Sequence, residues 1–161
     1  MRISRPILPV LAALASVVLC PAQPVVTVHG LGASAVSLSL ADLAKLPQQT
    51  VHFADRKQPV AFAGVLLLDV LSKVDLSAGE KFHKTRASYY VVVDAADGYK
   101  AVFAWAELDP DLAAKKVYLV TGQDGKPLAA ADGPFRLIVP DDKAGSRSVH
   151  QVTKFTLKQA N

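Results

Sequence analysis

The stretch Asp132-Gly133-Pro134-Phe135-Arg136-Leu137-Ile138-Val139-Pro140 decides the fold of this chain. Glycine and proline at its start are typical of a turn, and the apolar run 135–139 that follows predicts a buried strand. Proline cannot donate a hydrogen bond to a sheet, so Pro140 ends this strand. The chain is therefore expected to pass from a buried strand straight into a polar loop that begins at Asp141.

Most of the remaining chain is expected to form further strands. Alternating or apolar runs bounded by turn residues predict strands at 25–28, 36–39, 50–53, 60–62, 89–94, 100–105, 117–121 and 149–157. The pair Asp97-Gly98 is typical of a tight turn and predicts a hairpin between 89–94 and 100–105. This pattern indicates an α+β fold with a strand-rich mixed sheet.

Only a few short helices are expected. Ser39 is a suitable N-cap, with Asp42 three residues later as in a capping box, and Pro47 ends the helix that they begin. The leucine-rich segment 65–74 predicts the main buried helix. The segment 77–86 is charged and is expected to be a loop.

The N-terminal segment is typical of a secretory signal peptide. Arg2 and Arg5 precede the apolar run 7–19, which has the length of a signal-peptide core and falls short of the roughly 20 residues that span a bilayer. Small residues at positions 20 and 22 predict cleavage before Gln23. We therefore expect a signal peptide at 1–22, one domain at 23–161, and a periplasmic location.

A lipoprotein acylated at Cys20 is the alternative reading of the same segment. The residue before an acylated cysteine is normally small, whereas Leu19 stands there in this chain. Simple cleavage is therefore the preferred prediction.

Composition excludes several classes of protein. The 18 Lys and Arg residues against 14 Asp and Glu include two arginines of the leader, so the domain gives no case for nucleic-acid binding. Cys20 is the only cysteine, so domain 23–161 has no disulfide partner, thiol nucleophile or thiolate metal ligand. The four histidines lack the spacing of a metal site, and no catalytic residue is assigned.

Two clusters are candidate ligand sites. The first combines the aromatic side chains of Tyr99 and Trp105 with the carboxylates of Asp97 and Glu107. Aromatic faces stack on a flat heterocycle and carboxylates accept from its N–H groups. The even spacing of Tyr99 and Trp105 places them on one side of a regular strand. That side could equally be the core, so both readings stay open.

The second candidate is the polar loop 141–150, which carries Lys143, Arg147 and His150. Such a loop can hold a phosphate or another anion with its cations and backbone N–H groups. The alternative is a solvated loop in which Asp141 and Asp142 serve as counter-ions, and composition alone favours that alternative.

Six segments together resemble the molybdopterin-binding domain of the sulfite oxidase family, in its small stand-alone secreted form. They are 38–43 (LSLADL), 62–67 (FAGVLL), 97–99 (DGY), 107–109 (ELD), 132–140 (DGPFRLIVP) and 147–152 (RSVHQV). They follow the family's order and span nearly all of domain 23–161. The resemblance implies a mixed α+β fold with a pterin-shaped cleft.

The chain departs from this family at the metal anchor. In the family's enzymes a cysteine thiolate holds molybdenum, at a place that corresponds to the vicinity of Ala54 in this chain. The family's phosphate-holding loop corresponds to 143–147, and Asp142 replaces a glycine often found there. The added negative charge weakens the case for full molybdopterin and favours a phosphate-free pterin. A pterin or molybdopterin is therefore the candidate ligand, and molybdenum is not expected.

The resemblance therefore favours a non-catalytic pterin-binding protein. Tyr99 or Trp105 would stack on the ring, and Lys143 with Arg147 would hold its side chain or phosphate. Asp97, Glu107 or Asp132 would accept from its amino group. Some stand-alone members resemble periplasmic proteins that report pterin levels to a membrane-bound cyclic-di-GMP enzyme, which implies a membrane-bound signalling partner.

Two other functions remain open at this point. One is a molybdopterin-dependent oxidoreductase subunit that holds its metal without a protein thiolate. The other is a protein-interaction module whose cleft is vestigial.

Overall fold

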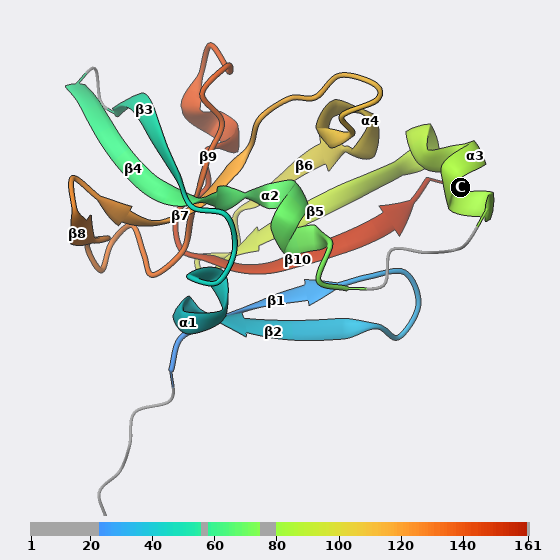
Figure 1. Cartoon of the computed structure of the whole chain (residues 1–161), viewed down its shortest axis with the longest axis horizontal. Helices are drawn as coiled ribbons and strands as arrows, with labels where there is room; N and C mark the ends of the chain where they lie inside the picture. Colours follow the sequence, from blue (N-terminus) through green and yellow to red (C-terminus); the bar gives the residue numbers. More distant parts are fainter. Residues whose placement is uncertain (1–22, 56–57, 75–79, 161) are drawn as a thin grey trace, which may run out of the picture.

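The computed structural model describes residues 23–55, 58–74 and 80–160 of the chain. Two sheets make up the domain (Figure 1). The larger sheet has the strand order β2 (Ala35–Ser39), β1 (Val25–His29), β10 (Val152–Gln159), β5 (Tyr89–Ala95), β6 (Lys100–Ala104). The smaller sheet has the order β3 (Gln49–Asp55), β4 (Gln58–Leu66), β7 (Tyr118–Gln123), β8 (Lys126–Pro127), and β9 (Arg136–Ile138) also pairs with β7.

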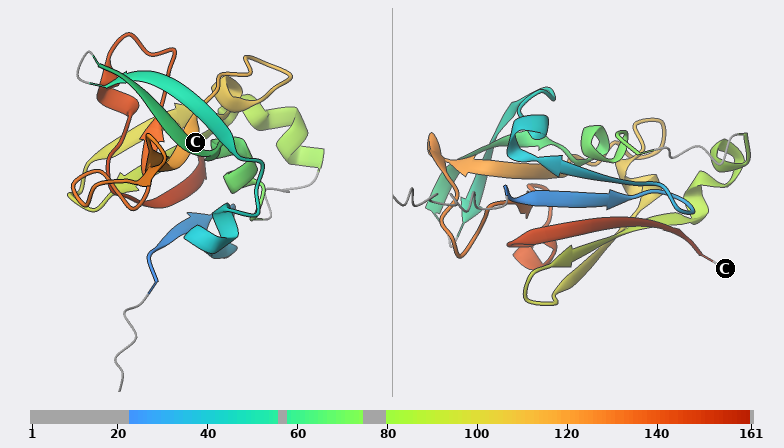
Figure 2. Two further views of the ribbon diagram at one scale, coloured as in Figure 1. Left: turned by 60° about the vertical axis from the view of Figure 1, so that its left-hand side comes forward. Right: turned by 90° about the horizontal axis from the view of Figure 1, so that it is seen from below.

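The last strand of the chain is central to the larger sheet. β10 pairs in parallel with β1 and antiparallel with β5, so the sheet is mixed as expected. Figure 2 shows β1 and β2 on one side of β10, and β5 and β6 on the other. Apolar side chains alternate along β10, with Val152, Phe155 and Leu157 buried in the main core. The predicted α+β class with a strand-rich mixed sheet is confirmed.

The helices are short. They are α1 (Leu40–Leu43), α2 (Leu67–Leu71), α3 (Glu80–Thr85) and α4 (Trp105–Leu108), with 3₁₀ turns at Arg86–Ser88 and Gly145–Arg147. The predicted capping box of α1 is confirmed. Asp42 N donates to Ser39 Oγ over 3.2 Å, and Ser39 N donates to Asp42 Oδ2 over 3.1 Å. None of the helices within the described ranges is long and apolar enough to cross a membrane.

The sequence predicts one main helix at 65–74, but the observed helix is shorter, and the first two residues of this range belong to a strand. Val65 and Leu66 pair with Leu119 and Tyr118 and so extend β4, and only Leu67–Leu71 is α-helical. A leucine-rich apolar run has no period that separates a buried strand from a buried helix. Pairing with β7 therefore makes Val65 and Leu66 part of a strand rather than of a helix.

The expected loop at 77–86 is also corrected, because its second half forms α3. Phe82 anchors this helix, with its ring 4.8 Å from the Tyr89 ring and 5.2 Å from the Trp105 ring. One buried aromatic residue among charged neighbours gives too weak a periodic signal to predict a helix. Residues 75–79, and the predicted signal peptide 1–22, lie outside the described residues.

The smaller sheet brings β9 beside the site described below. Tyr118, Leu119 and Val120 of β7 pair with Ile138, Leu137 and Arg136 of β9. All three β9 residues are buried, as the sequence predicts for this strand. A second, smaller core is formed by buried side chains of β3, β4, β7 and β9, namely Val51, Phe62, Tyr118, Val120 and Ile138.

Gly64 allows β4 to approach β7 closely. A Cβ atom at this position would lie 2.2 Å from Leu119 O and 2.5 Å from Val120 Cα, both backbone atoms that cannot turn aside. The β4–β7 register shifts between Ala63 and Gly64. Glycine is therefore required here for lack of space.

We expect Gly64→Ala to lower the free energy of unfolding by at least the roughly 1–3 kcal/mol typical of overpacking. Urea unfolding of the variant and the parent measures the difference. Gly145→Ala is the matched control, because a Cβ atom there meets nothing within 4 Å. Equal losses in the two variants would contradict the close approach of β4 and β7.

Candidate ligand-binding site

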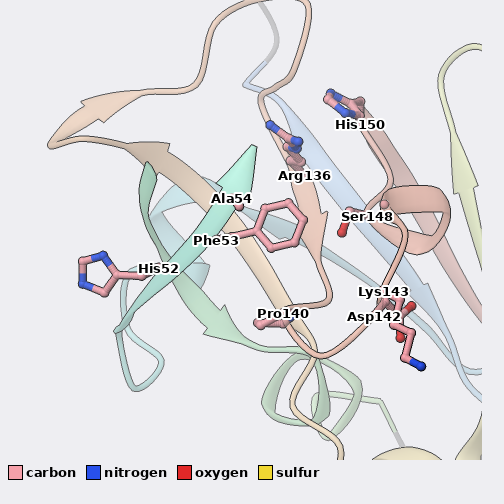
Figure 3. A pocket seen from close by; sticks show the side chains of 10 residues that line it. His52, Phe53, Ala54, Arg136, Pro140, Asp142, Lys143, Ser148 and His150 are labelled. Carbon is pink, nitrogen blue, oxygen red and sulfur yellow. The ribbon is translucent and has the colours of Figure 1, made fainter. Parts of the chain in front are cut away.

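A cavity of about 400 Å³ opens between β3, β9 and the polar loop that follows β9 (Figure 3). It is lined by His52, Phe53, Ala54, Arg136, Pro140, Asp142, Lys143, Gly145, Ser148 and His150. The expected turn out of the strand occurs at Pro140, directly after the buried residues of β9. The chain then returns to the cavity wall through the 3₁₀ turn Gly145–Arg147.

Arg136 places a buried positive charge on the cavity wall. The residue is only 2% exposed, and its guanidinium carbon lies 5.1 Å from the centre of the Phe62 ring. Its Nη1 atom lies 4.0 Å from Asp132 Oδ1. Burying a charged group is costly unless it is compensated. Arg136 therefore adds a buried cation, held beside Phe62 and Asp132, to the lining of the cavity.

His150 and Asp132 form a fixed pair at the cavity rim. His150 Nδ1 lies 2.7 Å from Asp132 Oδ1. An ionised carboxylate only accepts hydrogen bonds, so Nδ1 carries the hydrogen. In the neutral imidazole the other nitrogen, Nε2, is then an acceptor. Asp132 thus sets both the orientation and the hydrogen-bonding character of His150.

A network of ion pairs holds the loop against α4. Arg147 donates to Asp142 through Nε (2.7 Å) and Nη2 (2.8 Å), and through Nη1 to Glu107 Oε2 (2.9 Å). Its guanidinium carbon lies 4.8 Å from the centre of the Phe103 ring. Lys115 donates to the same Asp142 carboxylate.

These contacts shift the ionisation of the network. Hydrogen bonds from Arg147, and then from Lys115, lower the pKa of Asp142 to about 2 against the opposing effect of burial. The hydrogen bond to Asp142 raises the pKa of Arg147. The charge of Asp142, expected to oppose an anion, is thus offset by two cations.

The predicted site residues separate into groups. Lys143 lines the cavity, and Asp132 orients His150 behind it. Arg147 and Glu107 bind each other, and Glu107 Oε1 also accepts from Ala104 N at the start of α4 over 3.1 Å. Their side chains are therefore committed to the protein itself.

Trp105 is a correction to the predicted set. It begins α4, is 5% exposed, and packs in the main core rather than on a cavity. Its Nε1 donates to Asp109 Oδ2 over 3.2 Å. Tyr99, in contrast, is 48% exposed. The even spacing failed because the two residues lie outside the regular strand β6 at its opposite ends.

Tyr99 and Asp97 lie at a second cavity of about 260 Å³. Gly145, Ser148 and His150 line both cavities, so the segment 145–150 is their common wall. The sequence therefore grouped residues that the structure distributes between two hollows and the core.

Arg136, Phe53 and Ser148 are cavity residues that sequence reasoning did not select. Arg136 did leave a signal, as the one charged residue inside the apolar run 135–139. Phe53 and Ser148 left none, because an aromatic residue in a strand and a serine in a polar loop are both ordinary.

One protein family matches most of this chain in sequence. The sequence profile of the oxidoreductase molybdopterin binding domain family matches residues 16–161. The chain belongs to this family. A search of curated protein sequences returns no match.

Solved structures support the same fold. The sulfane dehydrogenase SoxCD from Paracoccus pantotrophus superposes with a TM-score of 0.62 at 17% sequence identity. The match covers 85% of this chain and 38% of that one, so this chain spans well under half of the dehydrogenase chain. The comparison confirms a sulfite oxidase-type molybdopterin-binding fold.

The residues present do not fit molybdenum ligation by this family's thiolate. Ala54 lines the cavity close to where the resemblance places the cysteine, and the only cysteine of the chain is Cys20. Within the described ranges, no group of three or more His, Cys, Asp or Glu is placed to hold a metal ion. The organic part of the cofactor is a better fit, since the cavity has the roughly 300–1,000 Å³ of small-molecule sites.

Protonation of Asp142 at low pH should break its ion pairs with Arg147 and Lys115. A lowered folded-state pKa contributes stability that is present above the unfolded value of 3.8 and is lost as the pH falls towards about 2. We expect Asp142→Asn to lower the free energy of unfolding by about 2 kcal/mol at neutral pH. The difference between variant and parent should shrink as the pH falls towards about 2. Urea unfolding across this range measures it.

Asp141→Asn is the control, because Asp141 is exposed and adjacent. It should track the parent at every pH. A gap for Asp142→Asn that persists unchanged at the lowest pH would contradict an electrostatic origin.

Proposed function

We propose that this chain is a non-catalytic binding protein for a pterin, and that it does not hold molybdenum through a protein thiolate. The observation that carries the proposal is the composition of the 400 Å³ cavity: Ala54 lies on its wall together with Arg136 and His150. The hollow of a molybdopterin-binding domain is present without its soft metal ligand.

The cavity groups match the chemistry of a pterin. A pterin is a flat heterocycle that has N–H donors, a carbonyl acceptor and a polar side chain. The Phe53 ring offers a face for stacking. His150 Nε2, fixed as an acceptor by Asp132, suits an N–H donor of the ring. Arg136 and Lys143 supply donors for oxygen atoms of the ring or its side chain.

The charge on the wall permits an anionic side chain as well. Arg147 and Lys115 offset the charge of Asp142, and Lys143 adds a positive charge to the lining of the cavity. A pterin with or without a phosphate is therefore compatible with the site, which widens the phosphate-free expectation drawn from the sequence.

We further propose that the protein works in the periplasm and reports pterin levels to a membrane-bound partner. The charged and apolar pattern of residues 1–22 supports export. The likeness to secreted pterin-binding members of the family supports the partner. Fold alone does not determine this role.

Calorimetric titration with tetrahydrobiopterin tests the binding. We expect saturable binding, and Arg136→Lys should weaken it about tenfold, because lysine keeps the charge but loses the planar fork of donors. Trp105 fluorescence should not report ring stacking, since Trp105 lies in the core. Thermal melts establish that the variant is folded.

Lys126→Ala is the matched control, because Lys126 is an exposed cation on β8 and does not line the cavity. It should bind as the parent does. Absence of heat and of a thermal shift with both oxidised and reduced pterins would refute the proposal.

A further inference from the structure

The second cavity, of about 260 Å³, shares the wall residues Gly145, Ser148 and His150 with the first. The turn between β5 and β6 contributes Asp97 and Tyr99, and the loop contributes Ser146 and Val149. Ser148 and His150, drawn in Figure 3 beside the first cavity, also line the second. The function proposed above leaves this hollow unassigned.

Tyr99 gives the second cavity a rigid aromatic face. Its hydroxyl donates to Ser146 O over 2.7 Å, and its backbone N donates to Asp97 Oδ1 over 2.9 Å. The residue is nevertheless 48% exposed. An exposed ring usually keeps its rotamer freedom, which a ligand must then remove at a cost. Here the protein has already fixed the ring.

The charge at the second cavity is opposite to that at the first. Asp97 is its charged lining residue, beside the titratable His150, and no lysine or arginine lines it. The first cavity carries Arg136 and Lys143. Asp97 uses Oδ1 for the Tyr99 amide, and Oδ2 makes no contact with a donor among the described residues. One carboxylate oxygen is thus available to a ligand.

Val149 and His150 complete the environment. Val149 is 2% exposed and supplies an apolar surface. Asp132 holds the imidazole of His150 in place. A fixed aromatic face, a fixed imidazole, an apolar surface and an available carboxylate oxygen suit a flat group that is positively charged.

We propose that the second cavity is a binding site for a small planar cation, of the amidinium, guanidinium or aromatic ammonium class, adjacent to the pterin site and sharing the wall residues Gly145, Ser148 and His150 with it. The ring of such a ligand lies against Tyr99, and its charge meets Asp97.

Benzamidinium is the probe, titrated into the ¹⁵N-labelled protein and followed by NMR. We expect saturable shifts at the amides of Tyr99, Ser146 and Val149, with Ala54 unmoved. Benzoate, which has the same shape and the opposite charge, should leave these amides unchanged. Asp97→Asn should weaken benzamidinium binding about tenfold, as expected for loss of a charge-assisted contact.

Two further variants separate the ring from the charge. Tyr99→Leu removes the aromatic face and should also weaken binding, while Asp141→Asn, an exposed carboxylate outside this cavity, should not. The spectra themselves show whether each variant is folded. Shifts confined to the first cavity, equal shifts with benzoate, or no effect of Asp97→Asn would each overturn the proposal. Failure of the protein to bind a pterin would leave this proposal standing, because the benzamidinium titration does not depend on pterin binding.

Discussion

The guanidinium of Arg147 lies between the carboxylates of Asp142 and Glu107 and over the ring of Phe103. Asp142 and Arg147 belong to the loop after β9, Glu107 belongs to α4, and Phe103 belongs to β6. Arg147 therefore ties the polar loop to the larger sheet, together with the Tyr99 hydroxyl at the β5–β6 turn, which donates to Ser146 O. Both cavities depend on this tie, because the segment 145–150 is the wall that they share. These partly buried ion pairs are fully hydrogen-bonded and so fix the geometry of the loop that lines the site.

The same network changes the electrostatics expected of the site. An aspartate in a phosphate-holding loop suggests repulsion of an anion, and the sequence offers no reason to think otherwise. In the folded chain two cations, Lys115 and Arg147, occupy the carboxylate of Asp142. The positive charges that reach the first cavity come instead from Lys143 and from Arg136, a residue of the buried strand. The negative charge of Asp142 is therefore offset within the protein, while Lys143 and Arg136 stand among the residues that line the cavity.

Local patterns in the sequence predicted the strands, the capping box of α1 and the buried strand before Pro140, because each depends on period or on the chemistry of a few adjacent residues. The helix at 65–74 was overestimated because an apolar run has no period, and α3 was missed because a single buried aromatic residue, Phe82, gives a weak periodic signal. Among the predicted site residues, Lys143 lines the first cavity, and its predicted contact with a ligand stays a prediction. The role of Arg147 could not be predicted, because its partner Glu107 is 40 residues away in the sequence. Trp105 was assigned to a strand face that ends one residue earlier.

The central claim is that a molybdopterin-type hollow binds a pterin without a thiolate-held metal. The most direct measurement is to denature protein purified from periplasm and to quantify released pterin, by its fluorescence, and molybdenum, by elemental analysis, in the same sample. The account predicts pterin in near-stoichiometric amount with molybdenum at background. Molybdenum in stoichiometric amount would contradict it and would return the chain to the oxidoreductases despite Ala54 on the cavity wall.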